Sequence, residues 1–315
     1  MPPPADNGPP PPAPSRFVWP PRHMRAPEPD PASLLPREEA GLPISIWSAI
    51  EHTWLGLASP PLAERSAAEG WHPDDPGAYC WRCGRSAGAF AVGADGCSEC
   101  ESTRVPWARV VRLGSYLPPL SALVREVKFT AFPRLGVDLG RLLGSAIASA
   151  LREAVAEGRL APGPRVEIVP VPTSFRRRLA RGIDHAAAIA RGVAGVAPTG
   201  ETWRVRPDLS RSHRPSQLSV NPSGRARNVA GSMRPSARGQ WRRNWSAWRA
   251  RESLTTPSTG QVSRVTVLID DVMTTGATMR EACRAYRLLY GTADTELWAG
   301  VLAVTPPRGE NAREA

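Results

Sequence analysis

Residues 265–278 decide the fold, and they read Val-Thr-Val-Leu-Ile-Asp-Asp-Val-Met-Thr-Thr-Gly-Ala-Thr. The first five residues are apolar or β-branched, which predicts a short buried strand. Asp270 and Asp271 follow where that strand is expected to end, and a turn rich in Thr and Gly leads into a helix expected to begin near Met279. A strand, a turn and a helix in this order are typical of α/β folds, whose ligands bind at the carboxyl ends of the strands.

The turn has the chemistry of an anion site. The first N–H groups of a helix lack intrahelical partners, and the helix dipole and nearby hydroxyls add to their attraction for phosphate. Asp270 and Asp271 repel phosphate and suit a sugar diol or a hydrated Mg²⁺. A phosphorylated sugar satisfies both parts, whereas the alternative is a plain helix start capped by the two acids. The predicted phosphate-binding residues are Thr274, Thr275, Gly276, Ala277 and Thr278.

This stretch resembles the 5-phosphoribosyl 1-diphosphate (PRPP) signature of type I phosphoribosyltransferases. The resemblance implies that Asp270 and Asp271 meet the ribose hydroxyls and that residues 274–278 hold the 5-phosphate. It also implies that PRPP arrives with Mg²⁺.

The composition favours anionic partners without naming them. The chain has 315 residues, a formal net charge of +11 and 41% hydrophobic residues, enough for one good core and a smaller module. Of its 40 basic residues only Lys128 is a lysine, so an Arg cluster carries less information than usual. We expect Lys128 to lie near the diphosphate or an acidic group and to act with Asp270 and Asp271 in catalysis.

The N-terminal region predicts a cytoplasmic protein with a disordered arm. The chain opens Met-Pro-Pro-Pro-Ala-Asp with no apolar run behind it, and no apolar stretch is long enough to span a bilayer. Residues 1–40 hold 14 prolines and no periodicity, which is typical of disorder. Apolar residues at helical spacing predict a short helix over 42–57.

Two Cys-x-x-Cys pairs follow, separated by thirteen residues. Four thiolates at this spacing suit one tetrahedral structural Zn²⁺, and Gly84 and Gly96 ease the tight turns. Redox pairs or disulfides are the alternative, which a reducing compartment disfavours. The predicted metal ligands are Cys80, Cys83, Cys97 and Cys100, whereas Cys283 is expected to be a small buried side chain.

Helices and strands alternate from about Val110. The pattern predicts helices over 121–129, 136–155 and 184–196, and strands over 166–171, 265–269 and 297–304. This order favours a doubly wound, mainly parallel sheet. The loop after Val169-Pro-Val-Pro172 meets the 274–278 loop at one edge of that sheet, and its arginines suit a diphosphate or a solvated surface. These are Arg176, Arg177, Arg178 and Arg181.

The ordered set of motifs resembles the competence protein F (ComF, amidophosphoribosyltransferase-like) family over residues 42–304. The set comprises the N-terminal helix, the Cys pairs, Glu126-Val-Lys-Phe129, Val-Pro-Val-Pro, Arg181-Gly182, the segment 211–228 and the Asp-Asp loop. The resemblance implies a type I phosphoribosyltransferase-like domain (108–304) behind a four-cysteine zinc-finger module (41–107), followed by a flexible tail (305–315). It also implies a link to the uptake and processing of DNA. Ile183-Asp184-His185 departs from the Phe-Asn-Gln common in the family.

A second departure is the Trp- and Arg-rich insertion at 235–262. Trp241, Trp245 and Trp248 recur at spacings of four and three between arginines, so a helix would carry them on one face. They either cover part of the core, which we favour, or stack on single-stranded bases.

Two functions stay open. The chain is either a pentosyltransferase that binds PRPP and an unidentified acceptor, or a non-catalytic module that binds single-stranded DNA or a DNA-processing protein and keeps the pocket as a relic or a sensor.

Overall fold

The computed structural model describes residues 60–88, 90–101, 104–129, 134–173, 184–211, 231–252, 262–291 and 295–307, with backbone alone for 101, 129 and 246–252. The predicted arm, the predicted helix over 42–57, the four arginines of 176–181 and most of the predicted tail lie outside this part of the chain. No helix within it is long and apolar enough to cross a membrane.

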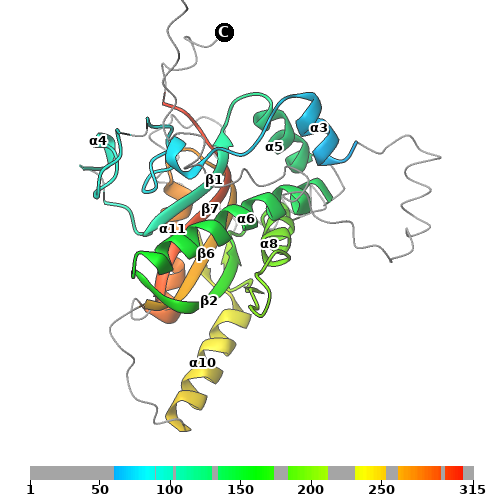
Figure 1. The fold of residues 1–315 in the computed structure, drawn as a ribbon. Helices are drawn as coiled ribbons and strands as arrows, with labels where there is room; N and C mark the ends of the chain where they lie inside the picture. The colour runs from blue at the N-terminus through cyan, green and yellow to red at the C-terminus, as the bar shows by residue number, and fades with distance from the viewer. Residues whose placement is uncertain are drawn as a thin grey trace, which may run out of the picture. The chain divides into compact units, whose positions relative to one another are not determined.

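Five parallel strands form the central sheet, in the order β1-β7-β6-β2-β3 (Figure 1). The predicted parallel α/β sheet is therefore confirmed. The strands are β1 (Arg109–Ser115), β2 (Leu160–Pro170), β3 (Arg204–Val205), β6 (Val262–Met273) and β7 (Thr295–Val304).

Helices cover both faces of the sheet because the central strands are apolar on both sides. In β6, Val267 and Ile269 pack into one hydrophobic cluster with α5, α6 and α8, whereas Leu268 packs into a second cluster with α11. Cys283 of α11 is fully buried there, as predicted. The four helices are α5 (Leu120–Phe129), α6 (Arg134–Ala156), α8 (His185–Ala194) and α11 (Ala277–Tyr290).

Close packing of α6 against α8 depends on glycine. A methyl group at Gly192 would lie 2.1 Å from the Val137 carbonyl oxygen, and one at Gly140 would lie 2.3 Å from the Ile189 carbonyl oxygen. Asp184, one of the residues that depart from the family pattern, caps the start of α8. Its carboxylate accepts a hydrogen bond from the Ala187 N–H at 3.2 Å.

The described part of the four-cysteine module, residues 60–107, contains α3 (Leu62–Ala68), the 3₁₀ turn η2 (Pro76–Ala78) and α4 (Ser98–Glu101). It packs directly on β1. The Val110 N–H donates to the Trp81 carbonyl at 2.7 Å, and the buried Arg112 guanidinium donates to the Gly84 carbonyl and the Asp74 carboxylate, each at 2.6 Å.

The Trp- and Arg-rich insertion contains one long helix, α10 (Ala237–Glu252), which follows the antiparallel pair β4 (Leu209–Arg211) and β5 (Met233–Pro235). Our favoured interpretation, that its tryptophans cover the core, is wrong for Trp241 and Trp245, which are 65% and 45% exposed. The physical reason is that Gly239 makes the close contact, since a methyl group there would lie 2.7 Å from the Asp208 carbonyl oxygen and 3.0 Å from Leu289. The far end of α10 extends away from the sheet (Figure 1).

Candidate functional site

The acid pair, Asp270 and Asp271, lies at the carboxyl edge of the sheet, near the end of β6 and just before the Thr-Gly loop (residues 274–278). Strand β6 runs further than predicted, through both acids to Met273. Its neighbour β2 is in register only as far as Ile269, whereas β7 pairs with Asp270 and continues beyond it. The two carboxylates therefore stand where the sheet opens on one side, which is the usual ligand position in a doubly wound fold.

Lys128 meets this pair from a distant part of the sequence. It lies near the end of α5, and its Nζ is 3.2 Å from Asp271 Oδ2. Both side chains are about one-fifth exposed, so the contact can be reached from solvent. The structure thus brings three of the predicted site residues together, while their catalytic role stays a prediction.

The Asp270 carboxyl does not titrate like a surface carboxylate. Burial, and then the negative charge of Asp271, raise the pKa of Asp270 to about 8. The Asp271 N–H, Lys128 and Arg211 act in the opposite direction without overcoming these effects. At neutral pH the Asp270 carboxyl therefore keeps a proton that an exposed carboxyl would have lost, and a cationic ligand would favour its release.

The Thr-Gly loop is open above the start of α11. Thr274 and Thr275 are exposed, and Gly276 adopts a left-handed conformation (φ 71°) as the residue before the helix. The Arg280 guanidinium donates to the Thr275 carbonyl at 2.7 Å and holds the loop from the helix side. This geometry directs the first N–H groups of α11 toward the open loop, as an anion site requires.

The sequence analysis did not predict a functional role for two further residues at this edge of the sheet. Thr173 directly follows Val-Pro-Val-Pro172, three residues after the end of β2, and its Oγ1 is buried with no hydrogen-bond partner among the described residues. Arg211, at the end of β4, acts electrostatically on Asp270. The position of Thr173 at a strand end was a usable signal, whereas the approach of Arg211 depends on tertiary structure.

The four cysteines form a second site, whose geometry fits zinc. Their ligand atoms lie within 4.8 Å of one another, and Sγ–Sγ separations of 3.7 Å join Cys97 to both Cys83 and Cys100, while Cys80 lies 3.8 Å from Cys100. Four sulfur atoms about 2.3 Å from one zinc ion would be about 3.8 Å apart in a tetrahedron. A hydrogen bond from Cys83 lowers the pKa of Cys80 to about 4, so one thiolate is already favoured.

No family model matches the sequence. The family is identified instead by similarity to individual proteins. The chain is 30% identical over 224 residues to the DNA utilization protein YhgH of Salmonella typhi, a match that covers 70% of this chain and 82% of the relative. This chain belongs to the competence protein F family. It is also 25% identical to Competence protein F of Haemophilus influenzae over 225 residues, with the same coverage, and 30% identical to YhgH of Escherichia coli K12 over 202 residues, covering 64% of this chain and 75% of that protein.

In this member of the competence protein F family, the four-cysteine module touches the Thr-Gly loop. The indole N–H of Trp107 donates to the Arg82 carbonyl, between two metal-ligand candidates, at 2.8 Å. The same ring packs beneath Gly276, and the Arg280 guanidinium lies over it at 5.8 Å. Beside this contact, a pocket of about 210 Å³ lies between the four-cysteine module and the Thr-Gly loop. It is lined by Cys83, Arg85, Glu99, Cys100, Val105, Trp107, Met273, Thr274, Thr275, Gly276 and Arg280.

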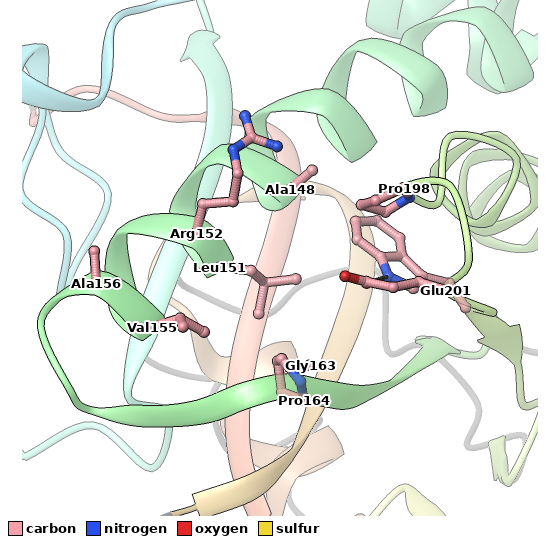
Figure 2. Close-up of a pocket in the computed structure, with 10 residues that line it drawn as sticks. Ala148, Leu151, Arg152, Val155, Ala156, Gly163, Pro164, Pro198 and Glu201 are labelled. Atoms are coloured by element: carbon pink, nitrogen blue, oxygen red, sulfur yellow. Dashed lines mark hydrogen bonds between the residues drawn. The ribbon is translucent and has the colours of Figure 1, made fainter.

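A larger pocket, of about 280 Å³, lies at the opposite edge of the sheet (Figure 2). It is lined by α6, by Gly163 and Pro164 near the start of β2, and by Trp203. Arg152 and Glu201 are the charged residues of its lining and lie on opposite sides of it. The lining is mainly apolar and holds none of the predicted site residues, so we assign the chemistry to the carboxyl edge.

Proposed function

We propose that this competence protein F relative binds PRPP at the carboxyl edge of its sheet. The 5-phosphate would lie on the Thr-Gly loop, and the ribose hydroxyls would donate to Asp270 and Asp271. The diphosphate would lie near Lys128 and the arginines of 176–181. The observation that carries this proposal is the contact of Lys128 with Asp271 beside an open loop at a helix start, because one ligand with a diol between two phosphate groups fits that arrangement.

A Mg²⁺ ion bound with PRPP would neutralise diphosphate charge, and the oxygen-rich Asp pair and the ligand suit its coordination. In a transfer reaction the bond from the anomeric carbon to the diphosphate oxygen breaks, and the diphosphate leaves with the electron pair. A nucleophile of the acceptor then bonds to the anomeric carbon and loses its proton. Lys128 would stabilise the departing charge, and Asp270 and Asp271 would hold the ribose in place.

Three ligands test the assignment of the subsites. PRPP with Mg²⁺ should bind more tightly than ribose 5-phosphate, which should bind more tightly than ribose, because each step adds a charged group with its own contacts. Titration calorimetry on the full chain measures this order. Equal affinity for ribose and ribose 5-phosphate would show that the Thr-Gly loop is no phosphate site. Release of diphosphate without added acceptor would show slow transfer to water.

A non-catalytic role in DNA handling is the second candidate. The relatives are named for DNA utilization and for competence. An exposed aromatic pair on a basic helix favours a DNA contact in this chain, apart from the PRPP pocket. In this candidate the pocket is a sensor or a relic. Saturable PRPP binding without any DNA binding favours the transferase, and the opposite result favours the DNA-binding module.

We further propose that the four-cysteine site holds one structural Zn²⁺ in a cytoplasmic protein. The sulfur separations and the Cys-x-x-Cys spacing support zinc. A closed set of four sulfur ligands leaves no open coordination position, so its role is to hold the module together. The reducing cytoplasm would keep all four cysteines available as thiolates.

A further inference from the structure

The surface of α10 presents two stacked tryptophans to solvent. Trp241 and Trp245 are one helical turn apart, so their side chains lie on the same face. Their ring centroids are 5.8 Å apart with an interplanar angle of 15°. Trp241 is 65% exposed and Trp245 is 45% exposed, so both rings present part of their surface to solvent.

Anchoring of α10 does not depend on these rings. Arg242 pairs with the fully buried carboxylate of Asp208, which also accepts a hydrogen bond from the Tyr290 hydroxyl at 2.9 Å. At the helix start the Gly239 N–H donates to Ser236 Oγ at 3.0 Å. Polar contacts of Gly239 and Arg242 therefore hold the first two turns of the helix.

The charge around the pair is positive. Arg234 and Arg238 are exposed on β5 and α10, and Arg238 lies three residues before Trp241 on the same side of the helix. Asp208, the acid of this region, is already neutralised by Arg242. An incoming partner therefore meets guanidinium groups beside aromatic faces.

We propose that the α10 surface, made of Trp241, Trp245, Arg234 and Arg238, binds single-stranded DNA. Unpaired bases stack on the indoles and backbone phosphates pair with the guanidinium groups. A duplex keeps its bases stacked on each other and offers no free face to the rings. An acidic protein would satisfy the charges but would not need a stacked aromatic pair. The inference deepens the DNA-handling candidate above and does not depend on PRPP binding.

Anisotropy of a fluorescent 20-nucleotide thymidine strand, titrated with the full chain, measures this contact. The variant Trp241→Ala/Trp245→Ala should bind about 5- to 150-fold more weakly for each stacked base that is lost. Trp241→Phe/Trp245→Phe should retain most of the affinity because it keeps aromatic faces. Arg234→Gln/Arg238→Gln should weaken binding and reduce the slope of log K against log salt by about 1.4.

Leu288→Ala is the matched control, because Leu288 is 58% exposed on α11 and lies outside the α10 surface. It should bind the strand like the wild type, and all variants should keep the wild-type melting temperature and PRPP affinity. Wild-type affinity in the double Ala variant would overturn the α10 assignment and leave DNA binding elsewhere. No strand binding by the wild type would overturn the DNA-handling candidate as well. Equal, Trp-dependent binding of polyglutamate would identify an acidic protein surface as the partner instead.

Discussion

Replacing Gly276 by Ala should damage the Thr-Gly loop more than it damages the fold. Gly276 has φ 71°, a conformation that costs an L-residue about 1–2 kcal/mol. The added methyl group would also lie 3.0 Å from Trp107 Cη2, a ring that is 5% exposed and hydrogen-bonded to the Arg82 carbonyl. The ring cannot move without disturbing the four-cysteine module, so the loop has to shift.

The expected effect of Gly276→Ala has two parts, a loss of stability and a loss of phosphate affinity. Backbone strain of about 1–2 kcal/mol corresponds to a fall in melting temperature of about 2–8 °C for a domain of this size. A shifted loop also loses hydrogen bonds to the phosphate. Each bond to a charged group contributes about 1.5–3 kcal/mol, so the loss of one weakens binding about 10- to 150-fold.

Gly158→Ala provides the control. Gly158 also has a positive φ, of 73°, but a methyl group there meets no atom within 4 Å. Both variants should therefore lose similar stability in a thermal melt, while Gly276→Ala alone should lose affinity for ribose 5-phosphate in titration calorimetry. If Gly276→Ala binds the phosphate as tightly as Gly158→Ala does, the proposed loop geometry is wrong.

Three further predictions concern the metal, the lysine and the acid pair. Protein purified without chelator should contain one zinc ion per chain by elemental analysis, and a folded, metal-free wild type would refute this. Cys97→Ser should lose both zinc and affinity for phosphate, because the four-cysteine module supports Trp107 beneath the Thr-Gly loop. Lys128→Arg should bind PRPP about tenfold more weakly at an unchanged melting temperature, and wild-type affinity would show that any cation suffices. Since the pKa of Asp270 is raised to about 8 in the folded chain from 3.8, its neutral form stabilises the fold below about pH 4, and this stability is lost as the pH rises to about 8. Asp270→Asn should therefore gain stability relative to the wild type across that range in denaturant titrations, and parallel pH profiles would contradict the raised pKa.

The central strand and the loop could be predicted because their signals are local. Five consecutive apolar or β-branched residues from Val265 specify a strand buried on both faces, and the Thr-Gly turn specifies the helix that follows. The Cys-x-x-Cys spacing is equally local. The sequence places the end of β6 too early because Asp270 and Asp271 interrupt the apolar run, whereas pairing with β7 carries the strand to Met273.

The remaining features depend on tertiary contacts. The sequence does not predict β1 as a strand, because Arg109 and Arg112 interrupt its apolar pattern. Arg112 can be buried because its guanidinium donates hydrogen bonds to the Asp74 carboxylate and to the Gly84 carbonyl of the four-cysteine module. The exposure of Trp241 follows from the way Gly239 and Asp208 seat α10, which the spacing of the tryptophans does not reveal. The approach of Lys128 to one particular acid, Asp271, likewise depends on how α5 packs.

The proposed PRPP site at Asp270 and Asp271 can be tested by titrating the full chain with PRPP and Mg²⁺, for the wild type and for Asp270→Asn/Asp271→Asn. We expect the wild type to bind one PRPP per chain saturably. The double variant should bind at least about tenfold more weakly, because the ribose hydroxyls lose both carboxyl acceptors, of which a charged one contributes about 1.5–3 kcal/mol. Its melting temperature should not fall. Absence of saturable binding by the wild type, or equal affinity in the folded double variant, would contradict a PRPP site at the acid pair.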